Sequence, residues 1–133
     1  MPNSKCQINP PAGGQIPNAK SSKYDLEERT QKFGADAIEF AKRLPLNIIN
    51  NPLISQFVRS ATSIGANYME ADVAESKKDF IHKIGICKKE AKETLHWLRM
   101  IAVSNSDKKD ECRTLWKEAH ELVLIFSAIN KKK

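Results

Sequence analysis

Polar side chains recur every three or four residues in the stretch QFVRSATSIGANYMEADVAES, which spans residues 56–76. The recurring residues are Ser60, Ser63, Asn67 and Glu70. Hydroxyl, amide and carboxylate groups along one line of a helix can form hydrogen bonds, and they could also serve catalysis or bind a metal. Each of these chemistries requires particular partners elsewhere in the chain, so the partners decide between them.

Glutamate pairs further along the chain raise the question of a metal site. Di-iron helical bundles use a Glu from each of two helices and a Glu-x-x-His motif from each of two others. In this chain Glu90 is followed at position 93 by another Glu, and Glu118 is followed at position 121 by another Glu. No histidine occupies the required place; the three are His82, His96 and His120. We therefore expect no metal and no other cofactor.

Nucleophilic catalysis would need a Ser or Cys beside a base and a group that orients that base. Ser60 and Ser63 fall in the middle of a predicted helix, and no such partners are recognisable for them. The three cysteines are far apart without a CxxC pair, and the chain has no glycine-rich phosphate-binding loop. The sequence thus favours a protein that is not an enzyme.

Four stretches carry apolar residues at helical spacing, and none shows the alternation of a strand. They are residues 24–44, a stretch that opens at Asn51-Pro52 and carries the polar line, residues 77–103, and the stripe over residues 112–129. Connections of a few residues join them. The pattern predicts an all-α fold, an antiparallel up-and-down four-helix bundle.

Particular residues mark the predicted helix ends. Pro45 disfavours helical geometry in the residue before it and would end the first helix. Asn51 would be the N-cap of the second helix, with Pro52 at its first position. Ser76 and Asp79 form a variant of the capping box and would open the third helix.

The chain divides into three parts by composition. Residues 1–22 hold four of the six prolines and little that could pack, which predicts a flexible leader. The bundle would cover residues 23–130, and residues 131–133 would form a basic tail. No apolar run is long enough to span a bilayer, and the N-terminal stretch lacks the apolar core of a secretory signal, so we expect a cytoplasmic protein without membrane contact.

The predicted second and third helices each carry more than one specialised face. On the second, the polar line lies about 130° from the apolar stripe, at 100° per residue. On the third, Glu90, Glu93 and Trp97 share a face beside the core stripe, and a solvated tryptophan would leave a large apolar area exposed. We expect this surface to be covered by another helix or another chain. The third helix also presents a basic ridge, which comprises Lys78, Lys88, Lys89, Lys92 and Arg99.

The net charge of +6 is unevenly distributed. Residues 24–76 carry five basic and eight acidic groups, whereas residues 77–133 carry fourteen basic and eight acidic groups. This distribution permits a polyanionic partner, although basic residues on a solvated face are the ordinary explanation.

The polar line and the acidic-aromatic face together resemble the four-helix-bundle family of 23S ribosomal-RNA intervening-sequence proteins. That family is related to the accessory variability proteins of diversity-generating retroelements. The resemblance covers about residues 24–130, and one departure is Ala71, where the family commonly has Gly after the motif Glu. The matching residues are Arg59-Ser60, Ser63-Ile64, Asn67, Glu70, Glu90-Ala91, Glu93 and Trp97-Leu98.

The resemblance implies a homopentamer of bundles packed side by side as a ring, with RNA or DNA and a reverse transcriptase as partners. The chain would then be an accessory factor of an rRNA intervening sequence or of a retroelement. A polar network or subunit seam would comprise Arg59, Ser60, Ser63, Asn67, Glu70, Glu90, Glu93 and Trp97. Nucleic acid would contact Lys78, Lys88, Lys89, Lys92, Arg99, Lys131, Lys132 and Lys133. The competing interpretation is a protein-protein scaffold that docks a partner such as a reverse transcriptase without touching nucleic acid.

Overall fold

The structure is a computed structural model that describes residues 25–131, and within this range it contains only helices and their connections. The predicted leader, residues 1–22, and two residues of the predicted tail, Lys132 and Lys133, lie outside the described residues. The all-α prediction with four helices is confirmed. The elements are α2 (Leu26–Lys42), α3 (Asn50–Asp72), α4 (Lys77–Ser104), the short 3-10 helix η2 (Ser106–Lys108) and α5 (Lys109–Lys131).

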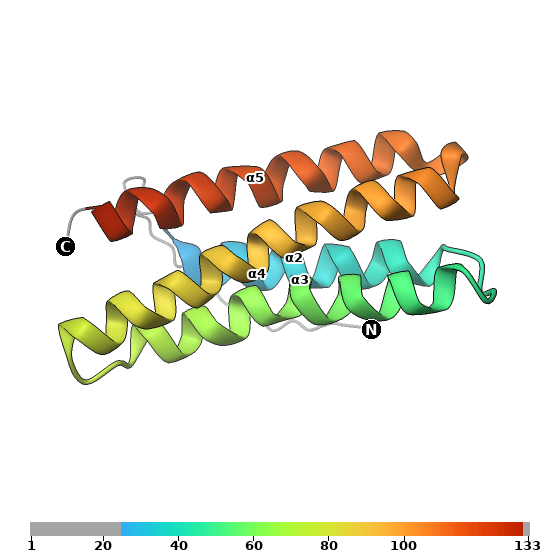
Figure 1. The fold of residues 1–133 in the computed structure, drawn as a ribbon. Helices are drawn as coiled ribbons and strands as arrows, with labels where there is room; N and C mark the ends of the chain where they lie inside the picture. The colour runs from blue at the N-terminus through green and yellow to red at the C-terminus, as the bar shows by residue number, and fades with distance from the viewer. Residues whose placement is uncertain (1–24, 132–133) are drawn as a thin grey trace, which may run out of the picture.

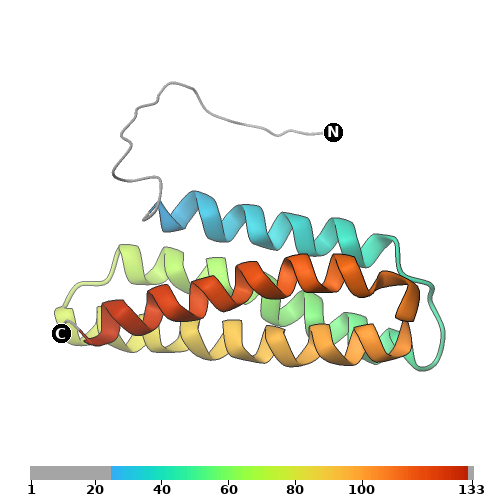
Figure 2. The same cartoon turned by 90° about the horizontal axis from the view of Figure 1, so that it is seen from above.

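The helices α3 and α4 form the central pair of the bundle. They share the most extensive contact, α2 packs mainly on α3, and α5 packs mainly on α4. Figures 1 and 2 show the connections alternating between the two ends, with the α3–α4 turn at one end and the other two connections at the opposite end. At 28 residues, α4 is about 42 Å long and so exposes a long lateral surface.

The core is a continuous apolar cluster between the four helices. Its largest fully buried side chains include Phe33, Phe40, Phe57 and Phe126. Phe40 of α2 meets Phe57 of α3 edge-on, with ring centroids 6.0 Å apart and an interplanar angle of 89°. Close approach of α2 and α3 depends on Gly65, because a Cβ atom at that position would lie 3.3 Å from Thr30 Oγ1.

Two helix starts follow the usual capping chemistry. Asp25 caps α2, and its carboxylate accepts a hydrogen bond from the Glu28 backbone N–H at 3.4 Å. Ser76 caps α4, and its Oγ accepts from the Asp79 N–H at 3.0 Å, which confirms the predicted start of that helix. Asp79 also lies in the first turn, where a negative charge complements the helix dipole.

The predicted cap of α3 at Asn51 is wrong. The helix already begins at Asn50, and the residue before it makes no side-chain capping bond. Asn47 caps the start of the helix instead, because its Oδ1 accepts hydrogen bonds from the backbone N–H of Ile49 at 3.1 Å and of Asn50 at 2.7 Å. Pro52 therefore sits in the third helical position, where its missing N–H still costs no hydrogen bond.

The side chain of Asn50 joins the two connections at one end of the bundle. Its Nδ2 donates to the Pro45 carbonyl at 2.8 Å and to Asn105 Oδ1 at 2.9 Å, while Asn105 Nδ2 donates back to Asn50 Oδ1 at 3.0 Å. Both amides are buried, with 1% and 5% of their surface exposed. This reciprocal pair ties the α2–α3 connection to the end of α4.

Candidate polar contact and basic surfaces of α3 and α4

An ion-paired cluster links the middle of α3 to the middle of α4. Arg59 Nη1 of α3 lies 3.2 Å from Glu90 Oε1 of α4, and Arg59 Nη2 donates to Glu93 Oε2. The indole N–H of Trp97, one turn further along α4, donates to the same Glu93 oxygen at 3.2 Å. The structure thus places in direct contact four residues that sequence analysis assigned to one surface.

The protonation of Glu93 follows from these contacts. Partial burial acts to raise the pKa of Glu93, but hydrogen bonds from Arg59 and Trp97 outweigh it, and the pKa lies below its ordinary value of 4.5. The hydrogen bond to Glu93 correspondingly raises the pKa of Arg59. Both groups are therefore charged at neutral pH, and they form an ion pair between α3 and α4.

Ser60 lies on the side of α3 that contacts α4. Its side chain is fully buried, and its Oγ donates to the Phe57 carbonyl at 3.2 Å. Thr94 of α4 is equally buried, and its Oγ1 lies 2.8 Å from Ser60 Oγ and 2.8 Å from the Glu90 carbonyl. A hydroxyl pair at this contact satisfies two polar groups that would otherwise be buried without a partner.

The next two residues of the polar line bond to their own helix. Ser63 Oγ donates to the Arg59 carbonyl at 2.7 Å, and Asn67 Nδ2 donates to the Ser63 carbonyl at 2.9 Å. Both residues are half-buried in the single chain. Such back-bonding satisfies the donors and leaves acceptor capacity at the surface of α3.

Glu70, the last residue of the line, lies at the surface. Its Oε1 pairs with Lys83 Nζ of α4 at 2.6 Å, and 59% of its side chain is exposed. The enclosure of all four polar residues is therefore not a property of the single chain. Ser60 is fully enclosed, and Ser63 and Asn67 are enclosed in part. Any cover for Glu70 would have to come from outside residues 25–131.

The predicted basic ridge lies on the surface of α4. Lys88 is half-buried, and the other four members are exposed. None of the five makes an ion pair within residues 25–131, whereas the acids beside them, Glu90 and Glu93, pair with Arg59. Lys131, the last residue of α5, is also exposed and lies toward the end of the bundle at which α4 begins (Figure 1).

Two residues that complete the contact, Thr94 and Lys83, are not marked by the sequence pattern. Thr94 lies one turn after Glu90, but a threonine beside an apolar stripe resembles an ordinary core residue. Lys83 was not assigned to any face, although it follows Glu70 by only one short connection. Opposite charges facing each other across a short turn are a usable signal for such a pair.

Within the described part of the chain, no group of three or more His, Cys, Asp or Glu side chains could hold a metal ion. Two cysteines fall in this part, Cys87 and Cys112, and both are buried. Burial raises the pKa of Cys87 to about 12 and that of Cys112 to about 11. Neither thiol is a nucleophile at neutral pH in this environment. No described helix combines the length and the apolar character that crossing a bilayer requires.

The chain belongs to a defined family. The model of the family described as 23S rRNA-intervening sequence protein matches residues 22–128, which include all of the polar contact and all of the basic ridge. The predicted family resemblance is thereby confirmed. No curated protein matches the chain.

A solved structure supports the same assignment. It is a protein of unknown function from the S23 ribosomal protein family of Bacteroides thetaiotaomicron, with a TM-score of 0.70 and 28% sequence identity. The similarity covers 80% of this chain and 98% of that chain. The four-helix arrangement is thus shared over nearly the whole length of that protein.

Proposed function

We propose that this chain is a non-catalytic cytoplasmic protein whose antiparallel bundles assemble side by side into a ring-like homo-oligomer that binds nucleic acid through α4. The observation that carries the proposal is the basic ridge. Its five cations project from one continuous helix and make no ion pair within residues 25–131. Uncompensated cations along a rod match the regular charge of a nucleic-acid backbone.

The family supports the choice of nucleic acid. Its description names an intervening sequence of 23S rRNA, which makes RNA a candidate ligand to test. On this proposal the chain acts as an accessory factor of an rRNA intervening sequence or of a retroelement. Side-by-side assembly would repeat the ridge in every subunit and so multiply the positive field.

The proposed binding would be largely independent of sequence. Lysine side chains on a helix surface contact phosphates, and phosphate contacts position a protein on the backbone without carrying sequence information directly. Each phosphate contact releases counterions, so affinity should fall steeply as salt rises.

A mobility-shift titration with RNA and with DNA at two salt concentrations tests the proposal. We expect binding at low salt, and we expect the double variant Lys89→Glu/Lys92→Glu to weaken it by at least about tenfold, because two phosphate contacts become repulsive. The control is Lys32→Glu/Lys42→Glu on α2, which changes the net charge equally on another face and should bind like the native protein. Absence of any shift at low salt, or equal loss in both variants, would refute a binding site on α4.

The second candidate function is a protein-protein scaffold that docks a partner such as a reverse transcriptase. Exposed aliphatic side chains at one end of the bundle favour it. Ile48 of the α2–α3 connection is 86% exposed, and Val103 near the end of α4 is 78% exposed. Such side chains are more typical of a protein contact than of a nucleic-acid contact. A native protein that forms a complex with a partner but shifts neither RNA nor DNA would favour this function.

A further inference from the structure

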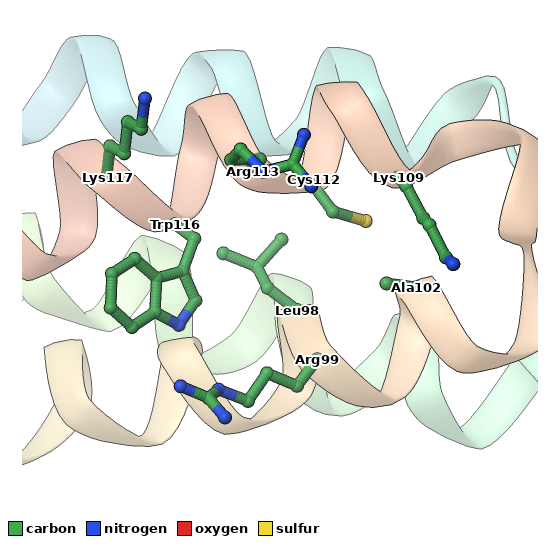
Figure 3. Close-up of a pocket in the computed structure, with 8 residues that line it drawn as sticks. All are labelled: Leu98, Arg99, Ala102, Lys109, Cys112, Arg113, Trp116 and Lys117. Atoms are coloured by element: carbon green, nitrogen blue, oxygen red, sulfur yellow. The ribbon is translucent and has the colours of Figure 1, made fainter.

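A groove of about 570 Å³ runs between α4 and α5, away from the polar contact. Its floor is apolar and is formed by Leu98 and Ala102 of α4 with Cys112 and Trp116 of α5. Leu98 and Cys112 belong to the buried core, so the floor is rigid. Figure 3 shows these side chains gathered in the space between the two helices.

Four cations line the same groove, and no acid does. Lys109, Arg113 and Lys117 follow one another at intervals of four residues on α5, which sets them in a row about 12 Å long. Arg99 comes from α4, and its guanidinium carbon lies 5.5 Å from the centre of the Trp116 ring. Of these four cations, only Arg113 has an ion-pair partner within the described residues, the exposed Asp110 at 3.0 Å.

The apolar floor and the surrounding cations together indicate what kind of ligand the groove would bind. An apolar floor gains from burying aliphatic side chains, and the surrounding cations require negative charges placed beside them. A row of about 12 Å corresponds to roughly two turns of a helix. We propose that this groove binds an acidic amphipathic helix of a partner protein, with aliphatic residues against the floor and carboxylates paired with the four cations.

Nucleic acid fits this groove less well than it fits the ridge. Single strands bind by stacking bases on free aromatic faces. The Trp116 ring is already stacked on His120, with centroids 5.0 Å apart and an interplanar angle of 8°, and Arg99 lies over the ring as well. A base would have to displace one of them, whereas an aliphatic side chain needs only the floor.

The chain itself supplies a poor occupant. Residues 1–24 contain three lysines and no acid, so their charge opposes that of the groove. In a second copy, the acids of α2 are partly neutralised, because Asp36 pairs with Lys32 at 2.9 Å and Glu39 pairs with Lys42 at 3.5 Å. At this groove, charge complementarity therefore favours a separate acidic partner over residues 1–24 and over α2 of a second copy.

The test uses a fluorescein-labelled synthetic helix of about twelve residues, with Leu on one face and Glu on both flanks, matched to the row of cations. Fluorescence anisotropy with the native protein should show saturable binding. A peptide with Lys in place of Glu should not bind, and one with Ser in place of Leu should bind at least about tenfold more weakly, because both the charges and the aliphatic face contribute.

Substitutions locate the site. Ala102→Glu places a carboxylate among the cations and should abolish peptide binding, whereas the matched change Ala128→Glu on the exposed side of α5 should leave it intact. Lys109→Glu/Arg113→Glu should weaken binding at least about tenfold. Lys109 lies in the first turn of α5, where an acidic residue suits the helix dipole, and Arg113 is exposed, so this second variant keeps the test valid even if Ala102→Glu does not fold.

The groove and the ridge share Arg99, but two double variants that leave Arg99 unchanged can separate peptide binding from the proposed nucleic-acid binding. The ridge variant Lys89→Glu/Lys92→Glu should bind the peptide normally, and the groove variant Lys109→Glu/Arg113→Glu should shift RNA normally. Absence of peptide binding by the native protein at low salt would overturn the inference. Equal loss of peptide binding in the ridge and groove variants would also overturn it, because it would indicate binding by general charge. A fall in oligomer mass in the groove variant would overturn it as well, because it would identify a second copy as the occupant.

Discussion

At the scale of single residues, Arg59 organises the contact between the central helices. It neutralises two glutamates that would otherwise repel each other on one face of α4, at Glu90 and Glu93. Trp97 adds a hydrogen bond to the same carboxylate, so an aromatic residue beside acids has a polar as well as an apolar role. The sequence predicted that Glu90, Glu93 and Trp97 share one face of α4, because their spacing follows the helical period. It did not reveal that one arginine would serve both acids.

The lowered pKa of Glu93 predicts a pH dependence of stability. The folded state holds this carboxylate ionised to lower pH than the unfolded state does, so its contribution is present above the ordinary pKa of 4.5 and is lost as pH falls through the lower folded value. Glu93→Gln should reduce the free energy of unfolding at neutral pH by up to about 1 kcal/mol, since the pair is partly exposed.

Chemical denaturation of both proteins from neutral pH down to pH about 3 measures this effect. The difference between them should shrink in the acid range. Glu75→Gln, at an exposed position in the α3–α4 connection, is the control and should change little at any pH. A difference that stays constant over the whole range would contradict a lowered pKa at Glu93.

At the scale of elements, the position of each helix in the sequence was predictable, but one helix start was not. Asparagine followed by proline is a frequent helix start, and Asn51-Pro52 matches it. The structure uses Asn47 for that purpose and buries Asn50 against Asn105. This choice depends on a residue 55 positions away in sequence, and no local pattern contains that information.

Asn50 and Asn51 therefore offer a direct comparison. Asn50→Ala should lower the free energy of unfolding by about 1–3 kcal/mol, because Asn105 Oδ1 and the Pro45 carbonyl both lose the hydrogen bond that Asn50 Nδ2 donates. Asn51→Ala, at an exposed position, should change it by less than about 0.5 kcal/mol. Thermal or chemical unfolding followed by circular dichroism compares the two. A larger loss of unfolding free energy for Asn51→Ala than for Asn50→Ala would contradict this expectation and would support Asn51 as the helix cap.

At the scale of the whole molecule, the polar line of α3 is only partly covered by its own chain. Ser60 is sealed against α4, whereas Glu70 faces outward with its Lys83 partner. The half-buried Ser63 and Asn67 lie between these extremes. This gradient makes the outer part of the line the place where a subunit seam would lie.

Light scattering of two variants tests the seam. If the outer part of the line contacts a second subunit, Asn67→Leu and Glu70→Ala should lower the oligomer mass and the melting temperature, since each leaves a buried polar group of the neighbour unsatisfied. Glu39→Ala, an exposed change on α2, should leave both unchanged. An unaltered mass together with an undiminished melting temperature in both line variants would show that the seam lies elsewhere or does not exist.

The four helices, the family and the residues that share each helical face were predictable without a structure. Periodicity is a local property, and apolar stripes at a spacing of three and four encode it completely. Which helical face packs against which was not predictable in this way and became clear from the folded structure. It paired Arg59 with two acids, set Thr94 against Ser60, left Glu70 at the surface and opened a basic groove beside Trp116. These outcomes depend on how helices rotate and cross to bury their stripes, which is settled by packing between residues far apart in the chain.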